Sequence, residues 1–174
     1  MNVTRIRVGH IRTNCYIIEK DGFVLVVDPG DEYGNIMATV GDNEIVGVIV
    51  THEHPDHVGA LEYFDKEKIY NYSNLKEGNM EIGPFQFEVI YTPGHARDSI
   101  SLYFKEEQKM FTGDFLFKEA IGRVDLPGSS MTDMIESLRR ISEYPPDIEV
   151  LPGHGSMTHL GVELENNKHL LINK

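Results

Sequence analysis

Three histidines and Asp56, whose side chains can bind a metal ion, lie close together in the segment Thr51-His52-Glu53-His54-Pro55-Asp56-His57. Imidazole nitrogens and carboxylate oxygens are usual ligands of zinc, and they also suit iron and manganese. Pro55 disfavours a helix through His54, because the residue before a proline is pushed toward extended backbone. The helical metalloprotease motif places a second histidine four residues after the first, and Asp56 occupies that position here. We interpret the segment as a metal-binding loop.

Three further candidate ligands each follow a predicted strand and stand in a glycine-containing turn. They are His95 in Thr92-Pro93-Gly94-His95, Asp114 in Thr112-Gly113-Asp114, and His154 in Pro152-Gly153-His154-Gly155. Glycine permits close backbone approach, and functional side chains often lie on loops at strand ends. With the first segment, these positions provide five histidines and two aspartates, which is enough to hold two ions.

The predicted elements place these candidates at strand ends. The apolar, β-branched run 45–50 predicts a buried strand directly before the first segment. Further strands are expected at 14–19, 23–27, 85–92, 100–104, 109–112 and 148–151, with hairpin turns at Lys20-Asp21-Gly22 and around Glu106-Glu107. Helical spacing of apolar residues predicts helices at 33–40, 57–64, 131–141 and from about 161 onward. This mixture indicates sheets covered by helices.

Composition limits the class of protein. A chain of 174 residues is most simply one domain, residues 1–174. The formal net charge of −12 argues against a nucleic-acid-binding surface. No apolar run approaches the ~20 residues that span a bilayer, and no signal-peptide core precedes Arg12. The single cysteine, Cys15, fits a reducing cytoplasm. We therefore expect a cytoplasmic protein with neither a nucleic-acid nor a membrane partner.

The ordered series of candidate ligands resembles the metallo-β-lactamase superfamily. The resemblance covers nearly the whole chain and includes Asn14-Cys15-Tyr16 and Asp28-Pro29-Gly30 near its start. It implies an α/β fold, a four-layer αβ/βα sandwich, with the metal site at one edge where the two sheets meet.

The resemblance also implies a role for each candidate. One ion is held by His52, His54 and His95, the other by Asp56, His57 and His154, and Asp114 bridges them. The carboxylates Asp56 and Asp114 are the expected catalytic residues. Asp28 and Thr51 are candidates for orienting the ligands, the alternative being an ordinary turn carboxylate and strand-end hydroxyl. The implied cofactor is two divalent ions, with zinc favoured over iron or manganese.

Subfamily features narrow the expected activity. Asp114 stands where several β-lactamases have cysteine, which disfavours antibiotic hydrolysis. The stretch from Phe115-Leu116-Phe117 to Ile121-Gly122-Arg123 and on to Gly128 resembles glyoxalase II-type hydrolases and persulfide dioxygenases. Classical glyoxalase II carries an additional C-terminal helical domain, and this chain ends at Lys174 without one. It most resembles the short, single-domain glyoxalase II-like proteins of bacteria and archaea.

The expected activity is therefore binuclear metal-dependent hydrolysis of a small thioester, such as an S-acylglutathione, by a metal-bridging hydroxide. The alternative is a mononuclear iron persulfide dioxygenase that uses His52 or His54 with His95 and Asp114. Nuclease activity and a noncatalytic binding role are less favoured. Arg123 and Lys118 are candidates for binding an anionic substrate, although Arg123 pairing with Asp125 to brace its loop is the favoured alternative.

Overall fold

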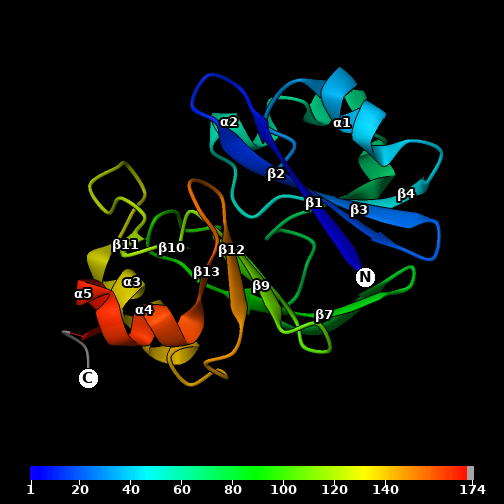
Figure 1. The fold of residues 1–174 in the computed structure, drawn as a ribbon. Coiled ribbons are helices and arrows are strands. Elements are labelled where there is room, and N and C mark those ends of the chain that lie inside the picture. Colours follow the sequence, from blue (N-terminus) through cyan, green and yellow to red (C-terminus); the bar gives the residue numbers. More distant parts are fainter. Residues whose placement is uncertain (172–174) are drawn as a thin grey trace.

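The computed structural model describes residues 1–171, which form two large β-sheets with helices on their outer faces (Figure 1). The first sheet has the order β1-β2-β3-β4-β5. Its strands are β1 (Asn2–Val8), β2 (Thr13–Lys20), β3 (Phe23–Val27), β4 (Glu44–Ile49) and β5 (Ile69–Tyr70). The Asp21-Gly22 turn joins β2 to β3, and both residues have positive φ, as a type I′ hairpin turn requires.

The second sheet has the order β13-β12-β9-β8-β7-β6. Its strands are β6 (Gly78–Ile82), β7 (Phe85–Tyr91), β8 (Ile100–Phe104), β9 (Lys109–Gly113), β12 (Glu149–Pro152) and β13 (Thr158–His159). A separate small hairpin pairs β10 (Leu116–Phe117) with β11 (Ala120–Ile121). The helices are α1 (Tyr33–Val40), α2 (Pro55–Val58), α3 (Met131–Ile141), α4 (Leu160–Asn166) and α5 (Lys168–Leu171).

Three apolar cores separate four layers. On β2, Tyr16 and Ile18 belong to the core between the sheets, whereas Cys15 and Ile17 belong to the core beneath α1. This follows from strand geometry, because successive side chains point to opposite faces. A third core joins the outer face of the second sheet to α3, α4 and α5, which lie together on the opposite side of the molecule from α1 (Figure 1). The expected α/β four-layer sandwich is confirmed.

The strand directions bring the candidate ligands to one edge. β7 and β9 are both antiparallel to β8, and β12 is parallel to β9, so the carboxyl ends of β7, β9 and β12 share an edge. The loop after β4 joins them, since the amide of Ile100 donates to the carbonyl of Thr51 at 2.9 Å. The turns after β9 and β12 also contact each other, with the Gly153 amide donating to the Gly113 carbonyl at 2.7 Å.

The helix expected at 57–64 is wrong in its extent. α2 covers Pro55–Val58, and a separate 3₁₀ turn covers Leu61–Tyr63. The break lies at Gly59, where a Cβ atom would come within 2.2 Å of the Gly30 carbonyl oxygen. The backbone of Gly59 packs closely against that of Gly30, and this contact interrupts the helix that the apolar spacing predicted.

Other elements also differ from expectation. The C-terminal helix is two short helices, because Asn167 between α4 and α5 has extended backbone. Strands β1, β6 and β13 were not expected, and each lies at an edge of a sheet. Within residues 1–171 no helix has the length and apolar composition required to cross a bilayer.

Candidate metal centre

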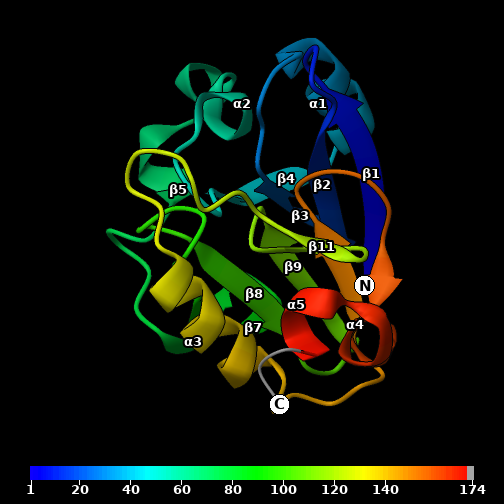
Figure 2. The same ribbon diagram turned by 90° about the vertical axis from the view of Figure 1, so that its left-hand side faces the viewer.

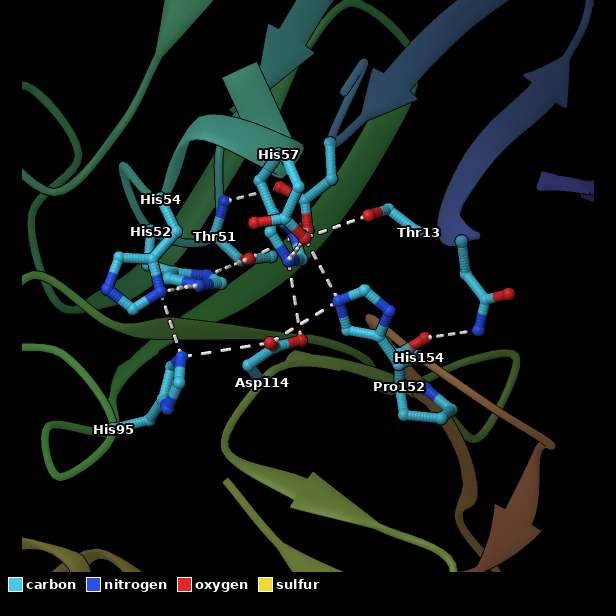
Figure 3. A network of polar contacts seen from close by, with 12 residues as sticks. Thr13, Thr51, His52, His54, His57, His95, Asp114, Pro152 and His154 are labelled. Carbon is cyan, nitrogen blue, oxygen red and sulfur yellow. Dashed lines mark hydrogen bonds and ion pairs between the residues drawn. The ribbon is translucent and has the colours of Figure 1, made fainter. Parts of the chain in front are cut away.

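Three histidines form the first half of the centre, at the ends of β4 and β7. Nδ1 of His54 lies 3.1 Å from Nε2 of His52 and 3.0 Å from Nε2 of His95. One imidazole nitrogen has a single in-plane proton or lone pair, so it cannot form good hydrogen bonds to both neighbours. Two nitrogens bound tetrahedrally to zinc at ~2.0–2.1 Å lie about 3.3 Å apart, close to this spacing. Figure 3 shows these rings meeting at their nitrogen edges.

Hydrogen bonds on the outer side of two rings set their tautomers. The Thr51 hydroxyl donates to Oδ2 of Asp28 at 2.7 Å, so its oxygen accepts from Nδ1 of His52 at 3.1 Å. Nδ1 of His95 donates to the backbone carbonyl of Arg123 at 2.9 Å. Each of these bonds holds the proton on Nδ1 and directs the Nε2 lone pair into the cluster, as metal-binding histidines require.

The second half of the centre combines a carboxylate with two histidines. Oδ2 of Asp56 lies 3.3 Å from Nε2 of His57 and 3.0 Å from Nε2 of His154. His57 is buried, and its Nδ1 donates to Oδ2 of Asp28 at 2.9 Å. Asp28 therefore serves both halves, through Thr51 in the first and directly in the second. Asp28 and Thr51 thus contact ring nitrogens of two candidate ligands, and their role in orienting these ligands stays a prediction.

Asp114 lies between the two halves. Its Oδ1 is 3.4 Å from Nε2 of His57, and its Oδ2 is 3.7 Å from Nε2 of His95 and 3.5 Å from Nε2 of His154. Gly153 makes room for this carboxylate, because a Cβ atom there would approach Oδ1 of Asp114 to 2.4 Å. The dashed lines in Figure 3 run from Asp114 to rings of both clusters. All seven candidate ligands from the sequence are therefore brought together.

Two atoms at the middle of the centre test whether the residues suit a metal. Nε2 of His57 and Oδ1 of Asp114 are buried and have no hydrogen-bond partner within residues 1–171. A buried polar atom without a partner costs about 1–3 kcal/mol. A divalent cation would satisfy a lone pair on each atom at once, so the residues present fit a metal centre.

The two halves differ in electrostatics. In the first half, burial and the neighbouring His57 lower the pKa of His52, and burial and His95 lower the pKa of His54. In the second half, the hydrogen bond to Asp56 raises the pKa of His154. The first half therefore favours neutral imidazoles, which are ready to bind a cation.

Carboxylates dominate the second half. Burial by itself would lower the pKa of His57, but the charge of Asp28, the hydrogen bond to Asp28 and the nearby carboxylates of Asp114 and Asp56 outweigh burial and raise that pKa. Burial likewise opposes ionisation of Asp56, yet the hydrogen bond from His154, the adjacent His57 ring and the hydrogen bond from Thr13 hold its pKa far below the usual range. An ion entering this half must displace a proton that these carboxylates stabilise.

Supporting residues on β2 were not singled out for a role by the sequence. The Thr13 hydroxyl donates to Oδ2 of Asp56 at 2.9 Å. The Asn14 amide and the Tyr16 hydroxyl both donate to the Pro152 carbonyl, at 2.8 and 2.7 Å, and so fix the turn that carries His154. The available signal was a run of polar groups at the start of an otherwise apolar strand.

The β10–β11 hairpin lies beside the second half of the centre. The ring of Phe117 is 6.4 Å from that of His154. The buried carboxylate of Glu163, on α4, accepts from the Glu119 amide in the hairpin turn at 2.7 Å. The Asn167 amide donates to the Ala120 carbonyl at 3.1 Å. These bonds tie the hairpin to the C-terminal helices.

The two basic residues predicted to bind substrate lie on exposed loops. Both nitrogens of the Arg123 guanidinium fork donate to the Asp125 carboxylate, at 2.9 and 3.0 Å. This pair fits the loop-bracing alternative, and the Arg123 carbonyl additionally orients His95. Lys118 is exposed in the β10–β11 turn and makes no ion pair with another described residue. Neither side chain enters the cluster of ligands.

Comparison with known proteins identifies the family. The model of the metallo-beta-lactamase superfamily matches residues 8–74 and 75–154. The chain belongs to this superfamily. Among relatives, it is 30% identical to the probable metallo-hydrolase YqgX of Bacillus subtilis and 28% identical to the hydroxyacylglutathione hydrolase GloC of Haemophilus influenzae. Each alignment covers 98% of this chain and 98% of the relative.

Solved structures of the superfamily agree with the fold. The BLEG-1 B3 metallo-beta-lactamase gives a TM-score of 0.90 at 28% identity, covering 97% of this chain and 99% of that one. TTHA1623 in a di-iron-bound form gives 0.85 at 29% identity, covering 95% and 98%. ETHE1 from Myxococcus xanthus gives 0.87 at 26% identity, covering 97% and 84%. This chain is therefore a metallo-hydrolase of the superfamily. Its cluster of histidines and aspartates is suited to binding metal ions.

Proposed function

We propose that this protein is a binuclear metal-dependent hydrolase of small thioesters, with an S-acylglutathione or a similar thiol conjugate as substrate. The observation that carries the proposal is the pair of complete ligand clusters that share Asp114. The resident cofactor would be two divalent ions, with zinc first and iron or manganese as alternatives. The likeness to hydroxyacylglutathione hydrolase GloC supports the thioester class.

Each part of the centre has a distinct task in this proposal. His52, His54 and His95 would hold one ion, Asp56, His57 and His154 the other, and Asp114 both. When bound, such a pair supplies hydroxide at neutral pH and stabilises negative charge on a carbonyl oxygen. Thr51 accepts from Nδ1 of His52 and so directs the Nε2 lone pair toward the centre, Asp28 accepts from Nδ1 of His57 and holds that ring in place, and Thr13 fixes the Asp56 carboxylate.

No protein nucleophile is needed for this chemistry. The single thiol, Cys15, is fully buried. Burial, and to a lesser extent the charge of Asp28, raise the pKa of this thiol. A thioester also has a good leaving group, because a thiol is far more acidic than an alcohol. The roles of Arg123 and Lys118 in binding an anionic substrate stay predictions. We further propose a cytoplasmic enzyme whose partner is a small molecule rather than a nucleic acid or a membrane.

A mononuclear iron persulfide dioxygenase is the second candidate. Two histidines and one carboxylate are the usual ligands of such an iron, and His52 or His54 with His95 and Asp114 would supply them. Nε2 of His95 lies 3.0 Å from Nδ1 of His54 and 3.7 Å from Oδ2 of Asp114. The di-iron-bound form of TTHA1623 supports iron as the metal, but with two ions rather than one. The complete second cluster around Asp56 favours the hydrolase, because a single iron would leave the ligands of that cluster without an ion.

Metal content and turnover measured on one sample test the proposal. The hydrolase predicts about two ions per chain and cleavage of S-lactoylglutathione. About one iron per chain, with oxygen uptake on glutathione persulfide and little hydrolysis, would instead establish the dioxygenase. A cephalosporin belongs in the same assay, because the BLEG-1 likeness makes β-lactam hydrolysis the natural competing activity. Preferred cleavage of the cephalosporin would overturn the thioester assignment.

A further inference from the structure

A pocket of about 420 Å³ opens beside the first half of the centre. His54 and Ala96 are among the residues that line it. Its walls come from the segment after β5, with Tyr72, and from the loop after β11, with Pro127. In Figure 2 the loop that follows β11 runs alongside the region of α2 and β5. The pocket is therefore positioned to hold a part of the substrate that extends away from the reacting bond.

One guanidinium in this pocket has no partner. Arg97 lines the pocket, is exposed, and makes no hydrogen bond or ion pair with any residue of the described chain. Arg123 and Arg140, by contrast, are paired with Asp125 and Glu77. Arg97 follows the candidate ligand His95 by two positions, so it stands next to the centre. In a chain of net charge −12, an unpaired guanidinium at this place favours a negatively charged ligand group.

The same pocket also presents carboxylates, and they are held apart from Arg97. The Glu53 side chain accepts from the Asn71 amide at 2.9 Å, and the Asp98 carboxylate accepts from the Glu53 backbone amide at 2.8 Å. Neither carboxylate forms an ion pair with Arg97 within residues 1–171. One pocket thus presents an unpaired guanidinium and, apart from it, carboxylates that hydrogen bonds hold in place.

An aromatic side chain supplies the apolar wall. The ring of Tyr72 is 4.7 Å from that of Tyr91, and the Tyr91 hydroxyl donates to the Leu75 carbonyl at 2.8 Å. This contact limits the movement of Tyr72 and gives a surface for methylene groups. A guanidinium, a separate carboxylate and an apolar wall together complement a short chain that ends in a carboxylate and an ammonium group.

We propose that this pocket binds the α-amino-acid end of the substrate's thiol arm, with its carboxylate at Arg97 and its ammonium group at Glu53. The proposal rests on the thioester hydrolase function and names its substrate class, thioesters of thiols that carry a free α-amino acid. Arg97 would then be a specificity-determining residue that contacts substrate. A bidentate guanidinium–carboxylate pair gives both affinity and orientation.

Direct binding of S-methylglutathione, a thioether that cannot be hydrolysed, tests the pocket by titration calorimetry on zinc-loaded protein. We expect Arg97→Gln and Glu53→Gln each to raise Kd by about tenfold or more, because each removes a charge-assisted contact with the ligand. Lys105→Gln is the matched control, since Lys105 is an exposed lysine outside this pocket and its substitution makes the same charge change as Arg97→Gln. Its Kd should stay within about twofold of the wild-type value.

Zinc content is measured on every variant, so that a change in the centre is not mistaken for a change in the pocket. If Glu53→Gln loses zinc, Arg97→Gln decides the assignment, because Arg97 lies outside the ligand segment 52–57. An unchanged Kd in Arg97→Gln, or no binding by the wild type, would overturn the proposal. A wild type that binds the probe through Arg97 but cleaves no thioester would support the pocket and refute the hydrolase function instead.

Discussion

The two halves of the metal centre differ in how strongly protons compete with a cation for their ligand atoms. In the first half the pKa values of His52 and His54 are lowered, which favours their neutral imidazoles. The second half surrounds His57 with carboxylates that raise its pKa. Protons therefore compete weakly for the first half and strongly for the second. Binding of an ion in the second half therefore depends on charge and on pH, whereas binding in the first half depends mainly on geometry.

Removing the carboxylate between the halves should have the largest effect. Asp114→Ala takes a ligand atom from each half, so we expect metal content to fall below one ion per chain. Hydrolysis should fall more than the about 100-fold that loss of an outer partner costs. Elemental analysis and the S-lactoylglutathione assay measure both. Asp42→Ala is the control, because Asp42 is exposed and has no partner among the described residues. Near-normal turnover in Asp114→Ala would exclude the bridging role.

Breaking only the second half separates the two candidate functions. His154→Ala should lower metal content from about two ions to about one, because the first cluster stays complete, and a binuclear hydrolase should lose about 100-fold or more in kcat/KM. The control is His159→Ala, an exposed histidine on β13. A variant that keeps one iron and full oxygen uptake with a persulfide would favour the dioxygenase.

The shared outer partner should have an intermediate effect. Asp28→Asn keeps the size of the side chain but places an amide where His57 and Thr51 now donate to a carboxylate. We expect affinity for the second ion to fall about 10–100-fold, with a smaller loss for the first. Competition with a zinc indicator measures each step, and Asp147→Asn, at an exposed position, is the comparison. Equal losses in both halves would show that Asp28 does not favour His57.

Lowering the pH should have the smallest effect of these changes, and it should weaken binding of the ion in the second half before binding of the ion in the first half. Below its raised pKa, His57 carries a proton on the atom that faces the centre, so a proton displaces the ion as pH falls. His52 and His54, with lowered pKa values, stay neutral to lower pH. The second ion should weaken about tenfold per pH unit below the His57 pKa, and before the first. Dialysis at stepped pH with elemental analysis checks the order; simultaneous loss would contradict it.

The ligand set was accessible from the sequence because each member follows a strand. Buried strands show as apolar runs, and the parallel directions of β9 and β12 then place Asp114 and His154 at the same edge. Edge strands were missed for the converse reason. β1, β6 and β13 each pair on one side only, so fewer of their residues need to be apolar.

The supports of the centre were harder to predict. Asn14 and Tyr16 act on the Pro152 turn across more than a hundred residues, and no local pattern encodes that contact. The partner of His95 is the backbone carbonyl of Arg123, an atom that every residue type possesses. Arg97 escaped notice because its significance lies in the absence of a partner within the described chain, which only the surrounding structure reveals.

The division of the ligands between two sheets has a consequence for folding kinetics. The first segment follows β4 in one sheet, whereas His95, Asp114 and His154 follow strands of the other. Both halves of the centre therefore form only after the sheets have docked. An ion stabilises contacts that are absent from any earlier transition state, so we expect it to slow unfolding and leave the folding rate nearly unchanged. The centre would then prolong the lifetime of the folded enzyme as well as serving its chemistry.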